Sequence, residues 1–311
     1  MESAAADRTL SGLSLAILSA CSFGTSGAVA AGLIASGWSP GAAVAIRVAV
    51  AALVLALPTV VAMRGRWGLV RDNLTLVVAY GVVAVAGCQL AYFQAVARMD
   101  VGIALLIEYT APVAVVMWLW LRYGRRPTRL VVVGAIVAAA GLTLVLDPFT
   151  GASLDTIGLL WALGAMIGAA TYFVISADEG NGLPPIALAG FGLTVGAGVL
   201  GLAGLVGVLD LTAGATTTTY ADWSVPSWVA LVVLGVVAGA LAYTSGVAAS
   251  RRLGSGVASF VALSEVLAAI LFAWVLLDQM PRWVQLLGGA GILAGVVLVK
   301  LGHRRPAVRP S

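Results

Sequence analysis

Three charged side chains lie inside long apolar stretches of the sequence: Arg47, Glu108 and Glu265. An ionisable group costs about 2.5–3.5 kcal/mol at the centre of a membrane helix, so each requires a partner or a function. Removal from water favours the neutral form of a carboxyl group and lets it exchange protons near neutral pH. Glu265 is therefore interpreted as a coupling residue that alternately holds a proton and a cationic or zwitterionic ligand. The alternative is a protonated Glu265 that only bridges two helices.

Six further side chains with polar atoms lie at or near the middle of apolar stretches: Gln89, Tyr92, Tyr109, Trp161, Tyr172 and Tyr243. Tyr and Trp that face lipid prefer the membrane interface, so mid-helix positions predict a cavity lined by these groups. Packing between helices is the alternative for each one. Cys21 and Cys88 lie in apolar runs without metal-ligand spacing and are interpreted as packing residues. No metal site and no cofactor are predicted.

The composition determines which elements position these side chains. Apolar residues make up 61% of the 311 and charged residues only 10%, with a mean hydropathy of +1.06. A soluble protein has about a quarter of its residues charged, so the surface of this chain must lie in lipid. The net charge of +4 is therefore no argument for a nucleic-acid partner. The predominance of Arg over a single Lys is typical of a GC-rich bacterial gene, which predicts a multi-pass protein of a bacterial cell membrane.

Ten stretches reach the roughly 20 mostly apolar residues that a spanning helix needs. No alternation of period two runs through them, so the prediction is an all-α membrane protein. The expected spans are residues 13–34, 42–63, 74–97, 102–121, 130–146, 157–176, 186–209, 228–249, 256–277 and 284–300.

The loops between these spans differ in positive charge. If the N-terminus is cytoplasmic, the inner loops and tails carry 14 of the 17 Lys and Arg residues, and the outer loops carry two. Positive residues concentrate on the cytoplasmic side of membrane proteins, so both termini are predicted to be cytoplasmic. With a rise of roughly 1.5 Å per residue, Arg47 and Glu108 then lie about 8 and 9 Å below the outer ends of their helices, and Glu265 lies near mid-membrane. Similar depth predicts an Arg47–Glu108 ion pair near an outer gate, with either a functional or a purely structural role.

The chain is internally duplicated. Residues 102–146 and 256–300 align at an offset of 154, with rare matches at Trp120/Trp274 and Pro127/Pro281. Five helices per copy is an odd number, so the second copy is expected to be inverted, which is a common construction of secondary transporters. The predicted organisation is a cytoplasmic tail (1–12), two five-helix repeats (13–146 and 157–300) and a basic tail (301–311). The polar stretch 213–224 is expected to be a solvated loop.

Several motifs of the second repeat resemble the EamA family of the drug/metabolite transporter superfamily. They are SRRLGSG (250–256), FVALSEVLAAILFAWVLL (260–277), the turn at Pro281 and LLGGAGILAGVVLV (286–299). In the first repeat, GIALLIEYTAPVAV (102–115) resembles a helix of the family's threonine and homoserine exporters. The sequence departs from the family pattern where Val follows Glu265 and where Asp278-Gln279 replaces a Gly-Glu pair. The resemblance covers both copies and implies a ten-helix carrier, most often an exporter.

These observations predict a secondary active transporter that exports a small metabolite, an amino acid or related zwitterion or cation, by proton-coupled alternating access. An importer, a facilitative exchanger and a multidrug efflux carrier are the alternatives within transport. An enzyme is disfavoured because the only His is His303 in the tail, and a channel or receptor because no ring of charges or signalling domain is found. The expected partners are the small-molecule substrate and the lipid bilayer, and the protein is expected to be a monomer or a homodimer.

Overall fold

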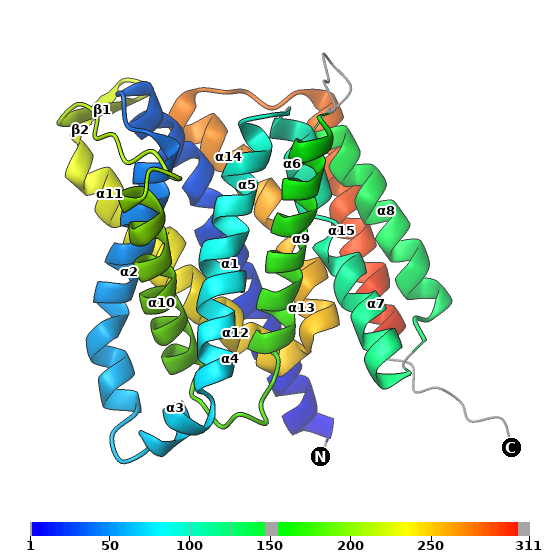
Figure 1. The fold of residues 1–311 in the computed structure, drawn as a ribbon. Coiled ribbons are helices and arrows are strands. Elements are labelled where there is room, and N and C mark those ends of the chain that lie inside the picture. Colours follow the sequence, from blue (N-terminus) through cyan, green and yellow to red (C-terminus); the bar gives the residue numbers. More distant parts are fainter. Residues whose placement is uncertain (1, 100, 125, 147–154, 304–311) are drawn as a thin grey trace, which may run out of the picture.

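The computed structural model describes residues 2–99, 101–124, 126–146 and 155–303, and in this part ten helices are long and apolar enough to cross a membrane. They lie side by side in one bundle (Figure 1), which confirms the all-α membrane fold with ten spanning helices. The first repeat contains α1 (Glu2–Ala35), α2 (Pro40–Ala62), α3 (Gly68–Asp72), α4 (Leu74–Ala79), the π-helical η1 (Tyr80–Gly87), α5 (Cys88–Val96), α6 (Val101–Glu108), α7 (Ala111–Tyr123) and α8 (Arg129–Leu146). The second contains α9 (Thr156–Ser176), α10 (Pro185–Leu205), β1 (Thr217–Tyr220), β2 (Trp223–Pro226), α11 (Ser227–Gly235), the π-helical η2 (Val236–Leu241), α12 (Ala242–Leu253), α13 (Ser255–Ala262), α14 (Glu265–Leu277) and α15 (Trp283–His303).

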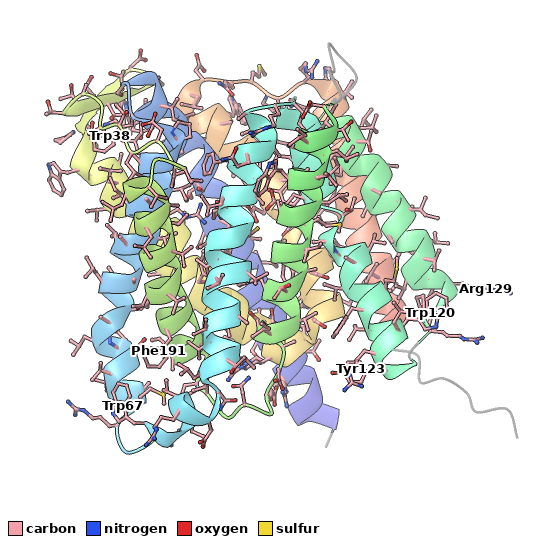
Figure 2. The ribbon with its side chains drawn as sticks, viewed as in Figure 1. Trp38, Trp67, Trp120, Tyr123, Arg129 and Phe191 are labelled. Carbon is pink, nitrogen blue, oxygen red and sulfur yellow. The ribbon has the colours of Figure 1, made fainter. Side chains whose placement is uncertain are left out.

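The bundle has two distinct ends. The start of α1 and the end of α15 lie at one end, here named the terminal end, and the β1–β2 hairpin lies at the other, the hairpin end (Figure 1). Figure 2 shows Trp67, Tyr123 and Arg129 toward the terminal end and Trp38 toward the hairpin end. Residues 2–12, expected as a tail, continue α1 as helix.

Local signals in the sequence fix the starts of several spans. The Ser39 hydroxyl accepts a hydrogen bond from the Ala42 amide at 3.1 Å and Pro40 follows as the first residue of α2. The Asp155 carboxylate accepts from the Gly158 amide at 2.6 Å and caps α9 in the same way. Such side chains satisfy amides that have no partner within the helix, and Pro has no amide to satisfy.

Two of the spans are broken at equivalent positions of the repeats. The fourth span is interrupted at residues 109–110, between α6 and α7, and the ninth at residues 263–264, between α13 and α14. At each break a hydroxyl donates to the carbonyl three residues earlier: Thr110 to Ile107 and Ser264 to Val261, both at 2.6 Å. Non-helical backbone at membrane depth is tolerated where polar groups re-satisfy it or where it lines a cavity. The two helix breaks are thus 154 residues apart, the same offset that relates the sequence repeats.

The third and eighth spans carry a second matched irregularity. Their π-helical segments, η1 and η2, end at Gly87 and Leu241, which are again 154 residues apart. π-helical turns are rare and occur frequently at functional sites. The duplication therefore preserves distortions in two pairs of helices, and both pairs contribute to the site described below.

Glycines bring α8 and α15 into backbone contact. A Cβ added at Gly134 would lie 2.7 Å from the Gly295 carbonyl oxygen, and one added at Gly141 would lie 2.5 Å from that of Gly288. The two contacts are equivalent, because at the 154-residue offset Gly134 corresponds to Gly288 and Gly141 to Gly295. Small residues at helix interfaces permit this approach in membranes.

The turns after α7 and α14 also match. Gly124 ends α7 with φ +66°, and Asp278 ends α14 with φ +55°, both in the left-handed region. This conformation has no steric cost for Gly but costs other residues about 1–2 kcal/mol, less for Asp and Asn. Asp278 therefore occupies a turn that favours glycine.

Replacing Asp278 with Gly is expected to stabilise the protein by up to about 1 kcal/mol, because the strain of the left-handed turn is relieved. The melting temperature of the detergent-purified protein measures this effect. Gly124→Asp in the equivalent turn is the matched control and should lower the melting temperature. Equal melting temperatures for the wild type and Asp278→Gly would contradict the assignment.

The polar stretch 213–224 is not the freely solvated loop expected from the sequence. It contains most of the β1–β2 hairpin, which packs on the α1–α2 turn at the hairpin end. The Tyr220 hydroxyl donates to the Val29 carbonyl at 2.8 Å, and the Trp38 indole donates to the Ala215 carbonyl at 3.1 Å. Burial raises the pKa of Tyr220 to about 12, so this bond persists at physiological pH. Composition alone did not show that the loop docks on α1.

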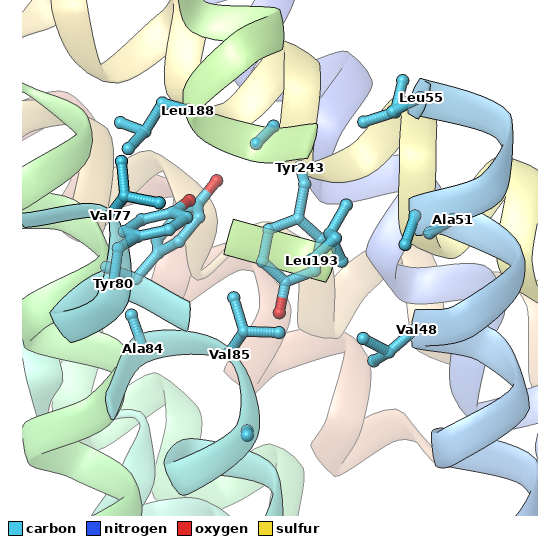
Figure 3. Close-up of a cluster of buried hydrophobic side chains, with 14 of the residues drawn as sticks. Val48, Ala51, Leu55, Val77, Tyr80, Ala84, Val85, Leu188, Leu193 and Tyr243 are labelled. Carbon is cyan, nitrogen blue, oxygen red and sulfur yellow. The ribbon is translucent and has the colours of Figure 1, made fainter. Parts of the chain in front are cut away.

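The main apolar cluster lies between α2, η1, α5, α9, α10 and α12. Figure 3 shows Leu188 and Leu193 of α10 together with Val48 of α2, Tyr80 and Tyr243. Leu193 is fully buried in this cluster. The second-repeat helix α10 is thereby packed into the core of the bundle, alongside α2.

Candidate functional site

A cavity of about 470 Å³ lies inside the bundle. It is lined by seven of the ten spans, and in the described part of the chain α8, α10 and α15 contribute no lining residue. Eight of the nine predicted site residues line it: Arg47, Gln89, Tyr92, Glu108, Tyr109, Tyr172, Tyr243 and Glu265. The broken and π-helical spans thus converge on the charged side chains that the sequence singles out.

The two ends of the cavity differ in exposure. At the terminal end its lining includes Ser250 and Ser259, which are 0% and 1% exposed. At the hairpin end it includes Pro40 and Ile34, and Ile34 is 42% exposed. These lining residues are therefore more deeply buried toward the terminal end, here named the closed end, than toward the hairpin end.

Arg47 projects from α2 into this cavity and is 6% exposed. One terminal nitrogen, Nη1, donates to the Ser26 hydroxyl at 2.8 Å. The guanidinium carbon lies 5.7 Å from the centre of the Phe23 ring, an arrangement that stabilises a cation. The Nε atom is buried without a hydrogen-bond partner in the described structure.

Glu108 is the last residue of α6, beside the break in the fourth span. Its Oε1 lies 3.5 Å from the Cys88 sulfur, and that thiol also lies 3.4 Å from the Ala165 carbonyl oxygen. The sequence interpretation of Cys88 as a packing residue missed this contact. Cys88 is the first residue of α5, directly after η1, and no sequence motif marks it as the partner of an acid.

Glu265 is the first residue of α14, beside the break in the ninth span. The Tyr109 hydroxyl, from the break in the fourth span, donates to Glu265 Oε1 at 3.5 Å. The N-terminal end of a helix carries partial positive charge, which favours the anion of a carboxyl group placed there. Glu108 and Glu265 therefore occupy opposite kinds of helix end, and both line the same cavity.

The predicted Arg47–Glu108 ion pair is not formed in the described structure, where no Glu108 oxygen lies within 4.0 Å of the guanidinium. Both side chains line the same cavity, as their similar depth suggests. Residue counting gives depth along a helix but not the direction in which each side chain points. Arg47 contacts α1, and Glu108 contacts α5.

Trp161 is the predicted lining residue that the structure places elsewhere. It is 40% exposed and is not part of the cavity wall. The inward face of α9 is formed by Ala162, Ala165 and Tyr172, and one residue along a helix rotates the side chain by roughly 100°. Trp161 thus faces outward, where its indole suits the membrane interface.

An aromatic series runs along the cavity toward its closed end. Phe23 and Tyr243 lie 5.1 Å apart between ring centres, Tyr243 and Tyr172 5.6 Å, and Tyr172 and Tyr80 5.9 Å. The Tyr172 hydroxyl is buried and closely contacts the Cα side of Gly246, so that a Cβ there would overlap it. Gly246 is therefore required for the position of Tyr172, and the sequence analysis did not identify it.

Gly246→Ala is expected to displace the Tyr172 ring and to lower substrate transport severalfold. Tyr172→Phe removes the nearest overlapping atom and leaves the Ser19 hydroxyl 2.7 Å from the added Cβ, so the double variant Gly246→Ala/Tyr172→Phe should recover part of the activity of Tyr172→Phe alone. Transport rates of the four proteins, normalised to protein in the membrane, measure this coupling. Strictly additive losses would show that the two positions do not interact.

The closed end is held by polar contacts among segments distant in sequence. Arg251 of α12 donates to the Leu183 carbonyl and, at 3.4 Å, to Asn181 Oδ1. Arg8 of α1 pairs with Glu179 and donates to the Arg251 carbonyl at 3.2 Å. The Arg8–Glu179 pair is about half exposed and adds little stability by itself. Together these bonds tie α1, α12 and the α9–α10 loop below the cavity.

Comparisons with known proteins agree with this architecture. A solved structure described as "Crystal structure of protein" superposes with a TM-score of 0.74 over 96% of this chain and 99% of its own. Its sequence identity is 19%, so the likeness shows a shared fold. A search of the curated proteins finds no match. The model of the EamA-like transporter family matches residues 10–147 and 156–301, which are the two repeats. The chain therefore belongs to the EamA-like transporter family, within the drug/metabolite transporter superfamily.

Proposed function

We propose that this membrane protein is a secondary active transporter that exports a small metabolite, an amino acid or a related zwitterion or cation, by proton-coupled alternating access. The observation that carries the proposal is the cavity at the centre of the inverted repeats, which holds one arginine and two carboxyl groups and is more deeply buried toward one end. Broken helices that meet at mid-membrane are typical of transporter binding sites. Glu265 is the proposed coupling residue.

The unequal use of α2 and α10 supports alternating access. These helices occupy equivalent places in the two repeats, yet α2 lines the cavity and α10 is packed behind it in the described structure. In the other pairs of equivalent spans, both members behave in the same way. The first and sixth, third and eighth, and fourth and ninth spans all line the cavity, and the described residues of the fifth and tenth do not. Exchanging the conformations of the repeats would place α10 on the cavity in place of α2 and open the terminal end. Because the two repeats have the same fold in opposite orientations, exchanging their conformations converts the outward-facing state into the inward-facing state with equivalent helix contacts.

The loop charges support the vectorial assignment. Most Lys and Arg residues belong to the terminal end, so we propose that this end is cytoplasmic in a bacterial cell membrane. The conformation described here then faces outward. Its closed cytoplasmic end must open for substrate to load during export.

Transport into proteoliposomes under an imposed pH gradient tests the proposal. Labelled amino acids of different side-chain size are offered to the purified full-length protein, with protein-free vesicles and a proton ionophore as controls. We expect saturable uptake that is driven by the gradient and abolished by the ionophore, together with counterflow in preloaded vesicles. Unsaturable flux would indicate a channel, and uptake unaffected by the ionophore would contradict proton coupling.

A further inference from the structure

Arg47 forms no ion pair with either cavity acid in the described structure. It is 94% withdrawn from solvent, and its hydrogen bond is to a neutral hydroxyl, that of Ser26. Its Nε has no partner, and no carboxylate of the described structure lies within 4.0 Å of the guanidinium. A charge held away from water is costly unless it is paired and fully hydrogen-bonded. The geometry therefore leaves a place for an anion beside Arg47.

The arginine is not needed to pack its helix. A Cβ added at Gly81 of the third span would meet Val195 and the Gly192 carbonyl of α10, and one added at Gly235 of the eighth span would meet Val50 and the Arg47 carbonyl of α2. Gly81 and Gly235 are 154 residues apart, so Arg47 corresponds to Gly192, next to Leu193 in the apolar cluster shown in Figure 3. The equivalent helix of the second repeat is thus packed with no side chain at this position. A costly cation in the first repeat calls for a role other than packing.

The charged side chains of the cavity come from different helices. Arg47 lies on α2 beside Ser26 and Phe23 of α1, Glu108 ends α6, and Glu265 begins α14, which packs on α1 at Gly24. Tyr243 and Cys88 also line the space. A small molecule that bears a carboxylate and an ammonium group matches this arrangement, and 470 Å³ is within the usual range for ligand pockets.

We propose that Arg47, together with the Ser26 hydroxyl, is the carboxylate-binding subsite of the cavity, and that the substrate is an α-amino acid zwitterion rather than a simple amine. This inference rests on the proposed function. The proposed function allows either a zwitterionic or a cationic substrate, and the subsite selects the zwitterion. A guanidinium binds a carboxylate through two parallel hydrogen bonds, which a lysine ammonium cannot reproduce.

Binding of matched compounds to the detergent-purified full chain tests the subsite. The probes are L-alanine and ethylamine, L-leucine and 3-methylbutylamine, and L-phenylalanine and 2-phenylethylamine, each pair differing only in the carboxylate. The wild type is expected to bind at least one amino acid about tenfold or more tightly than its amine, because a hydrogen bond to a charged group is lost with the carboxylate. Arg47→Gln should remove this preference, and Arg47→Lys should restore part of it.

Arg64→Gln is the matched control, because Arg64 is exposed and lies outside the cavity; it should leave the preference unchanged. A merely structural Arg47 predicts a different result, in which Arg47→Gln weakens the amino acid and the amine alike. That result would overturn the subsite, as would amines that bind the wild type as tightly as their amino acids, or no binding of any probe. Gradient-driven transport of an amine would leave the proposed carrier standing while refuting this inference.

Discussion

Glu265→Gln is expected to reduce amino-acid accumulation driven by a pH gradient to the level of protein-free vesicles. The neutral amide can neither release a proton nor hold an ammonium group, so both halves of the proposed exchange are lost. Gradient-driven uptake in proteoliposomes measures the effect. Asp72→Asn is the matched control, because it neutralises an exposed acid outside the cavity; it should transport at close to the wild-type rate.

The same variant separates coupling from a structural role. The Tyr109 hydroxyl donates to Glu265 Oε1 at 3.5 Å, and the carbonyl oxygen of Gln can accept that bond. If Glu265 were only a neutral bridge between the fourth and ninth spans, Glu265→Gln would retain transport. Its melting temperature should stay near that of the wild type in either case. Full gradient-driven uptake by a folded Glu265→Gln protein would therefore exclude the coupling role.

Gly141→Ala is expected to destabilise the bundle by about 1–3 kcal/mol, the usual range for an added group in a filled interior. The new Cβ would lie 2.5 Å from the Gly288 carbonyl oxygen and 2.7 Å from the Ile292 amide nitrogen. Both neighbours are backbone atoms, so α8 and α15 must separate to accommodate it. Thermal melting followed by size-exclusion chromatography measures the loss of folded protein.

Gly198→Ala in α10 is the control for Gly141→Ala. A Cβ at Gly198 meets no atom within 4 Å, so the substitution adds helix propensity without a clash. It is expected to leave the melting temperature unchanged or to raise it. Equal losses from the two substitutions would show that helix flexibility, rather than the close approach of α8 and α15, explains the effect.

The sequence predicted the spans and most of the cavity lining because these depend on composition and depth. Long apolar runs define the helices, and polar groups within them must avoid lipid. It did not predict which way each side chain points about its helix axis. Trp161 and Arg47 illustrate this: the first faces outward, and the second contacts Ser26 rather than Glu108.

The helix breaks could not be predicted from the usual signals alone. Pro112 marks the break in the fourth span, but Val266 occupies the corresponding part of the ninth, and both spans break at the same register. The hydroxyls of Thr110 and Ser264 are the shared feature. Side-chain hydroxyls compete with backbone bonds, yet they are common in intact helices as well, so their position became informative only with the structure.

The β1–β2 hairpin makes the two faces of the molecule unequal. It bonds to α1 through Tyr220, whereas the opposite end of the bundle carries the short helix α3 in the corresponding connection. In the proposed carrier, rearrangements that move α1 at the hairpin end must break these bonds, so the empty protein does not divide equally between its two facing conformations. Apparent affinity scales with the population of the conformation that is open to the substrate. The half-saturation concentrations of one substrate, measured from the two sides of the membrane in turn, should therefore differ.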